Sequence, residues 1–332
     1  TINRLQDVMA ERFGMEAGLF TTSGTQANLV ALMAHCQRGD EYIVGQQAHT
    51  YKYEGGGAAV LGSIQPQPIE FSEDGSIDLE AARAAIKPDD PHFANTKLFC
   101  LENTHAGKAL SMDYLKEAEQ FVQSENLAYH LDGARVYNAA IFHGVDVAEI
   151  TAPFDSSTCC FSKGLGAPIG SVTVGTREFI QEAHRWRKLL GGGLRQAGVV
   201  AAAALYAVDN NVERLAEDHE NAKWIADQLS QVEELDVRYH KMQTNMVFVS
   251  MPGHDPRALA AYLRERDIMI TPGATTRIVT HLDVDREAAK LLVDGIKDYF
   301  VSIGSGLSAT NRIRDYTEDL EHHGGTYQGS VA

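Results

Sequence analysis

Short apolar runs rich in β-branched residues alternate with helical patterns through the first 211 residues. Apolar residues recur at helical spacing over 78–86 and 112–125, and both stretches fall between strand-like runs. Neighbouring parallel strands need a long connection, and a helix is the usual one. The alternation therefore predicts an α/β fold whose mostly parallel sheet is covered on both faces. The strand-like runs are EYIVG (41–45), SIQPQPIEF (63–71), KLFCLEN (97–103), LAYHLD (127–132), STCCFS (157–162) and GSVTVG (170–175).

The pattern predicts two domains and a tail. Residues 1–211 form the predicted large domain, which opens with helical spacing over 2–13, a short strand within 17–24 and a helix over 25–36. Near residue 212 a long charged helix leads into a smaller α+β domain, 212–303. The last stretch, 304–332, is polar and lacks a clear period, so we expect a poorly packed tail.

Charge and cysteine usage exclude several classes of partner. The chain has 332 residues, a formal net charge of −16 and a pI of about 5.2, which disfavours nucleic acid and anionic membrane surfaces. No apolar run approaches the ~20 residues of a membrane span. The four cysteines have no metal-ligand spacing, and their apolar neighbours predict buried free thiols in a reducing compartment, the cytoplasm.

Lys163 stands between a strand-like run and glycines, in CCFSKGLGAPIG (159–170). A solvated lysine in a turn is the plain interpretation. The functional one is a Schiff-base lysine, whose amine needs a desolvated or cationic setting, with glycines that let a planar partner approach. The glycine spacing does not match a dinucleotide-binding fingerprint.

TTSGTQAN (21–28) places a small polar turn between a strand and a helix. Gly24 and Thr25 stand where the N–H groups of a helix N-terminus point outward, which suits a phosphate. The alternative is an ordinary Ser/Thr cap. No lysine follows in P-loop register, so a nucleoside triphosphate is not expected.

Four further residues follow strand-like runs. Asp132, in YHLDGARVYN, can hold a protonated ring nitrogen or cap a helix, and Arg135 follows three residues later. His49 and His105 each offer a ring to stack and a neutral base near pH 7, although a lone histidine is usually only packed or solvated. No histidine pair has metal-ligand spacing, so we predict no metal site.

Arg277, in the strand-like run TRIVTHLD, can hold a carboxylate with both arms of its guanidinium, or lie on the surface. Each of these features is weak alone. Together they form a set that matches what binding of pyridoxal phosphate requires: along the chain come a phosphate pocket, a histidine, a strand-end aspartate and a strand-end lysine. The sequence therefore predicts pyridoxal 5′-phosphate as the cofactor.

Longer stretches carry a resemblance to a family. The chain resembles the low-specificity L-threonine aldolases, which are fold-type I pyridoxal-phosphate enzymes. The resemblance runs from residue 1 to about 303 and implies an aspartate aminotransferase-like large domain with a smaller C-terminal domain. The matching stretches are SGTQANLVALMAHCQRGDEYIVGQQAHTY, GGAAVLGSIQPQPI, KLFCLENTHAGKAL, LDGARVYNAA, SKGLGAPIGS, RKLLGGGLRQAG and RIVTHLD.

The resemblance implies a role for each candidate residue. Lys163 forms the Schiff base with the cofactor, and His105 lies near the substrate hydroxyl. The other cofactor contacts are Gly24, Thr25 and Ser162 at the phosphate, His49 stacked on the ring, Asp132 at its nitrogen and Arg135 at its oxygen. The other substrate contacts are Arg277 and Arg135 at the carboxylate, with Lys188 and Arg195 near the site or a neighbouring subunit.

The resemblance implies retro-aldol cleavage of L-threonine or L-allo-threonine to glycine and acetaldehyde, with His105 or His49 as the base. The family forms homotetramers, as dimers of dimers. Two alternatives stay open: another fold-type I lyase or transaminase, and a cofactor-binding homologue with little activity. The second arises because the family's N-terminal pocket segment has no counterpart in this sequence, just as residues 304–332 have none in the family.

Overall fold

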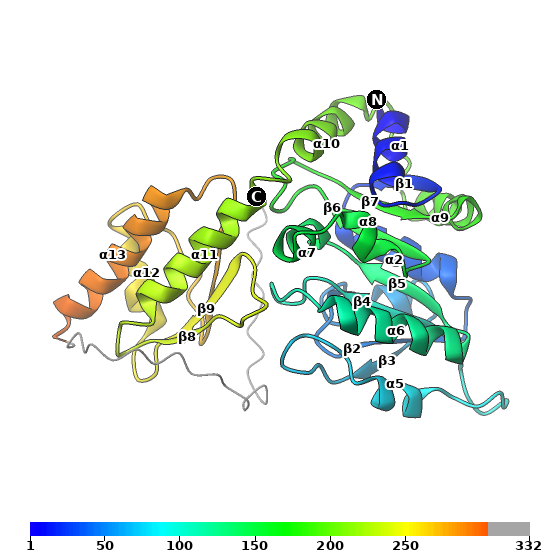
Figure 1. Ribbon diagram of the computed structural model, residues 1–332, viewed down its shortest axis with the longest axis horizontal. Helices are drawn as coiled ribbons and strands as arrows, with labels where there is room; N and C mark the ends of the chain where they lie inside the picture. Colours follow the sequence, from blue (N-terminus) through cyan, green and yellow to red (C-terminus); the bar gives the residue numbers. More distant parts are fainter. Residues whose placement is uncertain (305–332) are drawn as a thin grey trace. The chain divides into compact units, whose positions relative to one another are not determined.

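The computed structural model describes residues 1–304 and divides the chain into two compact units, Thr1–Leu215 and a second unit that begins at Ala216. From residue 305 on, the predicted tail lies outside the described residues. Figure 1 labels the elements of both units. Each unit has its own hydrophobic core and its own sheet.

A seven-stranded sheet forms the centre of the first unit, in the order β1-β7-β6-β5-β4-β2-β3. All neighbouring pairs from β6 to β3 are parallel, and β7 runs antiparallel to both of its neighbours. The predicted α/β fold with a mostly parallel sheet is thus confirmed. The strands are β1 (Ala17–Thr21), β2 (Asp40–Gly45), β3 (Gln65–Ile69), β4 (Asn95–Glu102), β5 (Ala128–Asp132), β6 (Ser156–Cys160) and β7 (Ser171–Gly175).

The antiparallel β7 follows from its short connection to β6. Only residues 161–170 link the two strands, too few for the helical crossover that a parallel neighbour requires. The connection is a tight loop, in which Phe161 N donates to Gly170 O and Ala167 N to Phe161 O, each at 2.9 Å. Because β2, β4, β5 and β6 are parallel, their carboxyl ends meet at one edge of the sheet, and this loop lies there.

Helices cover both faces of the sheet. Along β4, Leu98 and Cys100 point to one apolar cluster while Phe99 and Leu101 point to the other, as alternation in a strand requires. The first face is covered by α2 (Gly24–His35), α3 (His49–Lys52), α4 (Gly57–Val60) and α9 (Arg177–Leu189). The second is covered by α1 (Ile2–Arg12), α5 (Leu79–Ala85), α6 (Met112–Glu125), α7 (Val136–His143), α8 (Val147–Thr151) and α10 (Gly198–Asn210).

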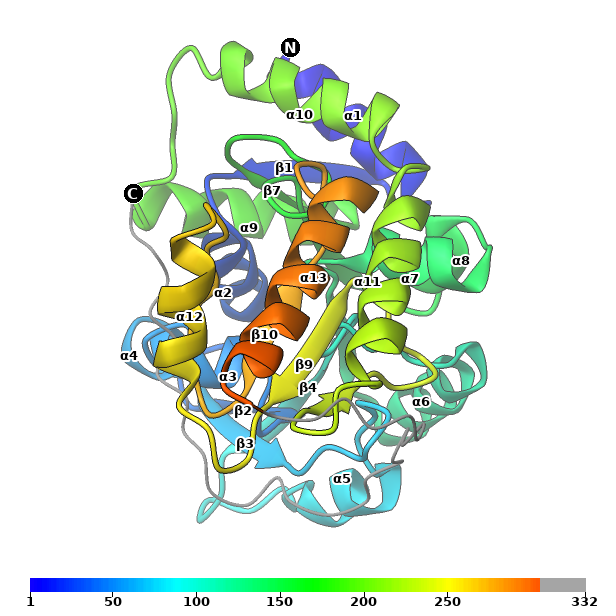
Figure 2. The same cartoon turned by 90° about the vertical axis from the view of Figure 1, so that its left-hand side faces the viewer.

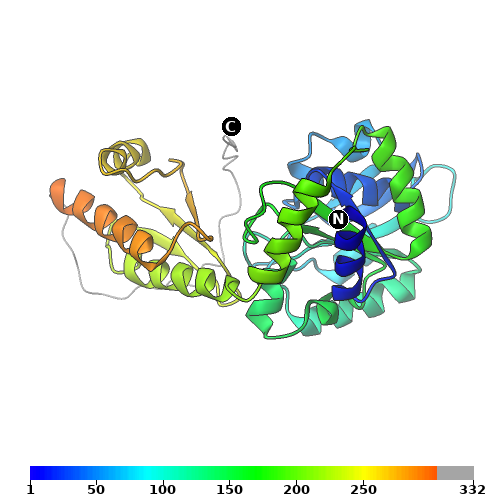
Figure 3. The ribbon, with the colours of Figure 1, turned by 90° about the horizontal axis from the view of Figure 1, so that it is seen from above.

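Side-chain caps fix where several of these helices begin. Ser23 accepts a hydrogen bond from the Gln26 N–H at the start of α2, and Ser111 and Thr176 cap α6 and α9 in the same way. At the far end of the unit α1 packs beside α10 (Figure 3), where Arg12 donates to the carbonyl of Val208. These contacts hold the frame that carries the carboxyl edge of the sheet.

The second unit is a three-stranded antiparallel sheet in the order β10-β9-β8, with α11, α12 and α13 in front of it in Figure 2. Apolar residues of the three helices pack on β9 in one core. The elements are α11 (Leu215–Leu229), β8 (Asp236–Arg238), β9 (Met246–Ser250), α12 (Pro256–Arg264), β10 (Thr276–Val279) and α13 (Arg286–Ser302).

All four cysteines are buried and unpaired, which confirms the predicted free thiols. Across residues 1–304, no helix combines the length and the apolar character needed to cross a bilayer.

Candidate active site

Lys163 lies in the loop between β6 and β7, three residues beyond the end of β6. Its carbonyl accepts a hydrogen bond from Gly166 N at 2.9 Å, which closes a turn around the lysine, and its side chain is partly buried. The neighbouring parallel strand β5 ends at Asp132. The pKa values of Asp132 and His49 are both raised, and the charge of Lys163 opposes the rise at each, so all three groups share one region of the first unit.

Asp132 is the last residue of β5 and only 2% exposed. Its Oδ2 accepts from Asn28 Nδ2 at 2.8 Å, and its Oδ1 accepts from Ala134 N at 3.1 Å. Burial and the nearby Glu102 carboxylate raise the pKa of Asp132, and the charge of Lys163 opposes that rise. The positive charge near this carboxylate does not fully offset the cost of burying its ionised form. A protonated ring nitrogen would supply further positive charge.

His49 begins the short helix α3, after the carboxyl end of β2. Its Nδ1 lies 2.8 Å from Glu54 Oε1, and its side chain is 41% exposed. The hydrogen bond with Glu54 is the largest cause that raises the pKa of His49. Glu54 fixes one edge of the imidazole and leaves the ring accessible for stacking.

Asn28, on α2, connects these groups. Its amide nitrogen donates to Asp132 and, at 2.9 Å, to Glu54 Oε1, while its amide oxygen accepts from Thr158 Oγ1 at 3.1 Å. Ligand atoms of His49, Glu54 and Asp132 lie within 4.8 Å of one another, the one group of potential metal ligands among the described residues. Asn28 donates to both carboxylates of this group and Glu54 also contacts His49 Nδ1, so hydrogen bonds within the protein already link the three side chains.

His105 follows the end of β4. Its Nδ1 lies 3.1 Å from Glu102 Oε1, and the other oxygen of Glu102 accepts from the His49 backbone N–H at 2.6 Å. One carboxylate therefore contacts both predicted histidines. The predicted pair lies along the carboxyl edge of neighbouring strands β2 and β4.

The phosphate pocket predicted over 21–28 is a helix N-terminus. Ser23 caps α2, and the N–H groups of Gly24 and Thr25, in its first turn, have no intrahelical acceptor. A Cβ added to Gly24 would come within 2.7 Å of Cys160 Sγ, at the end of β6. The first turn of α2 thus packs directly on the strand that leads to Lys163.

Four further predicted residues are located by the elements that carry or flank them. Ser162 is exposed beside Lys163, and Arg135 precedes α7, three residues after Asp132. Arg277 lies on β10 in the second unit, and Arg195 is exposed in the segment between α9 and α10. The roles of these four residues stay predictions.

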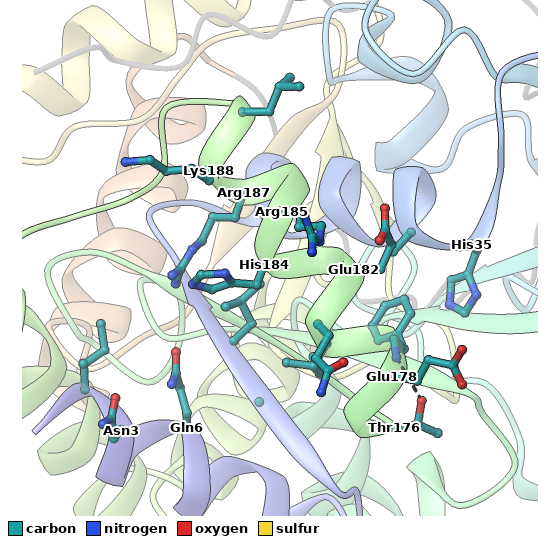
Figure 4. Close-up of a pocket in the computed structure, with 18 of the residues that line it drawn as sticks. Asn3, Gln6, His35, Thr176, Glu178, Glu182, His184, Arg185, Arg187 and Lys188 are labelled. Atoms are coloured by element: carbon teal, nitrogen blue, oxygen red, sulfur yellow. Dashed lines mark hydrogen bonds between the residues drawn. The ribbon is translucent and has the colours of Figure 1, made fainter.

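Lys188 lines a separate hollow of about 1500 Å³ along α9 (Figure 4). Other residues of this hollow come from α1 and β1, such as Gln6 and Leu19, and none of the histidines or carboxylates described above lines it. Near Lys188 the figure shows Arg187, which donates to the carbonyl of Phe20 at 2.6 Å. The role of Lys188 near the site or a neighbouring subunit also stays a prediction.

Three site residues were not predicted from the sequence: Asn28, Glu54 and Glu102. Glu54 stands five residues after His49 and Glu102 is the last residue but one of a predicted strand, so position alone offered a weak signal for both. Nothing in the sequence around Asn28 distinguishes it from a helix residue that faces the core.

The described residues fit the predicted pyridoxal phosphate. They offer an amine, a buried carboxylate, a ring to stack and free N–H groups at a helix N-terminus. In addition, the amide nitrogen of Asn103 is buried without a hydrogen-bond partner in the described part of the chain. Its backbone N–H donates to the carbonyl of Asp132 at 3.0 Å, so this residue belongs to the same edge. A buried donor left unsatisfied indicates a place for a polar ligand.

Comparisons with known proteins show the family to which the chain belongs. The family model of the beta-eliminating lyases matches residues 1–252. The chain is 54% identical over 287 residues to the low specificity L-threonine aldolase of Escherichia coli (strain K12), covering 86% of this chain and 85% of that protein. It is 42% identical to low-specificity L-threonine aldolase 1 of Arabidopsis thaliana, covering 84% of this chain and 80% of that one.

Solved structures share the fold at low identity. A threonine aldolase from Leishmania major superposes with a TM-score of 0.75 at 19% identity, covering 90% of this chain and 88% of that one. A cysteine desulfurase from Thermococcus onnurineus NA1 gives 0.68 at 18% identity, covering 91% and 84%. The architecture is thus shared by proteins named for different reactions, and the residues at the site must decide the chemistry.

Proposed function

Because the chain belongs to the low-specificity L-threonine aldolases of the beta-eliminating lyase family, we propose that it cleaves L-threonine and L-allo-threonine to glycine and acetaldehyde. The fold is that of fold-type I pyridoxal-phosphate enzymes, as the sequence predicts. The observation that carries the proposal is that Asp132 and His49, linked through Asn28 and Glu54, lie at the same carboxyl edge of the first sheet as the loop that carries Lys163.

The family depends on pyridoxal phosphate, and we assign the groups that hold it in this chain. Lys163 Nζ would bind the aldehyde, and Asp132 would bind the protonated ring nitrogen. The N–H groups of Gly24 and Thr25, with Ser162, would bind the phosphate, because a helix N-terminus favours an anion. His49 would stack on the ring, and Arg135 would contact the ring oxygen. When bound, the cofactor would supply an electron sink for the pair left at Cα when the Cα–Cβ bond breaks.

Protein groups would orient and deprotonate the substrate. Arg277 binds the substrate carboxylate, with Arg135, and so fixes the direction of the Cα–Cβ bond. His105 or His49 takes the proton of the β-hydroxyl, the oxygen becomes the carbonyl of acetaldehyde, and a proton returned to Cα completes glycine. The amine of Lys163 would lie close to the groups that exchange these protons.

Assembly and location are further parts of the proposal. Large apolar side chains are exposed on α9, on α10 and between them, including Leu189, Leu194, Val199 and Tyr206. Such a surface supports a homo-oligomer, a dimer of dimers, with Lys188 and Arg195 of this segment near a neighbouring subunit. The four free thiols support a reducing compartment, the cytoplasm.

Product analysis tests the proposed reaction. Purified protein with pyridoxal phosphate and L-threonine should release acetaldehyde and glycine in equal amounts. Release of ammonia and a keto acid would instead indicate a β-eliminating lyase, and transfer of the amine to an added keto acid would indicate a transaminase. Cofactor binding without any product would favour a homologue with little activity.

A further inference from the structure

Glu102 uses both of its carboxylate oxygens within the protein. Oε2 accepts from the backbone N–H of His49 at 2.6 Å, and Oε1 lies 3.1 Å from Nδ1 of His105. The side chain is 14% exposed and comes from the end of β4. With both oxygens occupied, this carboxylate orients its neighbours and is not available to a ligand.

The ring of His105 is held on its other sides as well. Phe71 stacks on it with the two centroids 3.9 Å apart and an angle of 23° between the ring planes. The backbone of His105 exchanges two hydrogen bonds with Lys108, at 3.0 and 2.8 Å. An imidazole fixed by stacking and by its backbone keeps one edge toward Glu102 and the other edge away from it.

We infer that Glu102 is a positioning residue, which holds His105 in the tautomer with hydrogen on Nδ1 and leaves Nε2 free to take the β-hydroxyl proton. This inference rests on the proposed function and assigns the base to His105. An ionised carboxylate only accepts hydrogen bonds, so the nitrogen that faces it carries the hydrogen. In the neutral ring, Nε2 then holds the lone pair that a general base needs.

The state of Glu102 agrees with this role. Burial works to raise the pKa of Glu102, but the His105 ring and the N–H of His49 outweigh burial and hold that pKa below its ordinary value. The carboxylate thus stays ionised at neutral pH and accepts from both partners.

Glu102→Gln tests the inference with little change of shape. A backbone N–H can only donate, so the new amide oxygen should accept from His49 and the new amide NH₂ should face His105 Nδ1. His105 Nδ1 must then accept, and the hydrogen moves to Nε2, where it removes the lone pair. We expect kcat for threonine cleavage to fall by about 10²-fold with KM nearly unchanged, since a wrong tautomer disables a base without disturbing binding.

A double-mutant cycle separates positioning from a general structural effect. His105→Asn keeps a donor where Nδ1 was and removes Nε2. If Glu102 acts through His105, adding Glu102→Gln to His105→Asn should lower kcat less than ~3-fold further. Losses that multiply in the double variant would overturn the inference. Glu41→Gln, a fully buried glutamate on β2 paired with Lys87, is the matched control and should keep the wild-type kcat.

A second readout does not depend on turnover. In protein labelled with ¹⁵N-histidine, the His105 signals are those missing from His105→Asn. They should report hydrogen on Nδ1 in the wild type and on Nε2 in Glu102→Gln. The same tautomer in both proteins would overturn the inference even if threonine is cleaved. Absence of threonine cleavage by the wild type, with the tautomer exchanged as expected, would refute the proposed function while the placement by Glu102 stands.

Discussion

Asn28 and Asp132, 104 residues apart in the sequence, are joined by a hydrogen bond of 2.8 Å between the amide nitrogen of one and the carboxylate of the other. The same nitrogen donates to Glu54. One neutral side chain thus holds two buried carboxylates beside each other. Burial is the largest cause that raises the pKa of both acids, so the ionised form of each acid relies on its hydrogen-bond donors for stabilisation.

Asn28→Ala should destabilise the protein. Removing the amide leaves two buried acceptors with one donor fewer each, which costs about 1–3 kcal/mol per unsatisfied group. Urea unfolding measured for the cofactor-free protein checks this. Asn210→Ala, at an exposed asparagine near the end of α10, should change the free energy of unfolding far less. Equal losses in the two variants would contradict the assigned role of Asn28.

Asp132→Ala should impair catalysis more than cofactor attachment. The carboxylate keeps the ring nitrogen protonated in the proposed mechanism, and one preorganised charge of this kind is worth ~10²–10³ in kcat. The visible absorption band of the bound cofactor should persist, because Lys163 is intact. Steady-state acetaldehyde release beside an absorption spectrum measures both quantities. A variant that keeps its full rate would remove Asp132 from the mechanism.

Gly24→Ala should weaken cofactor binding and folding together. The new Cβ would meet Cys160 Sγ at 2.7 Å, so the first turn of α2 must move away from β6. Overpacking of this kind costs about 1–3 kcal/mol. Fluorescence titration with pyridoxal phosphate should show a higher Kd, and adding Cys160→Ala should restore much of the affinity. Gly57→Ala, where the new Cβ meets only ordinary contacts, serves as the control.

Acid should destabilise the first unit through two histidines, the buried His130 and the partly buried His35. His35 and His130 both contact Ser156 Oγ, at 2.6 and 2.7 Å, and burial lowers the pKa of His35 to about 4 and the pKa of His130 to about 3. Both values lie below the ordinary 6.5, so the unfolded chain binds protons that the folded chain refuses. The contribution of these two neutral histidines to the free energy of unfolding should therefore be complete above pH 6.5. It should decrease as the pH drops toward 4, by about 2 kcal/mol per histidine at pH 5.

Urea unfolding at pH 7.5 and pH 5 measures this loss. His35→Gln should reduce the difference in the free energy of unfolding between pH 7.5 and pH 5. His92→Gln, at a histidine with a side chain 84% exposed, should leave that difference unchanged. A pH dependence that is the same in the wild type and in His35→Gln would show that His35 does not contribute to acid destabilisation.

The sequence predicted the parts of the fold that depend on local pattern. Strand and helix periodicity located the elements around Lys163, Asp132 and Gly24, and a residue that follows a parallel strand must lie at the shared carboxyl edge. The order that places β7 between β1 and β6 was not predicted, because pairing of distant strands leaves no periodic signal. The hydrogen bonds of Asn28, Glu54 and Glu102 were missed for the same reason, since each forms across folded elements. The roles of the individual residues at the site remain predictions, and for Arg277, Lys188 and Arg195 the described contacts add no support.

The central claim is that the amine of Lys163 is the group that binds pyridoxal phosphate. Protein incubated with the cofactor, reduced with borohydride and digested should yield one modified peptide, identified by mass spectrometry. We predict that the phosphopyridoxyl group lies on Lys163, within the segment that joins β6 to β7, and that Lys163→Ala yields no modified peptide. Modification of another lysine, such as Lys188, in place of Lys163 would contradict the account.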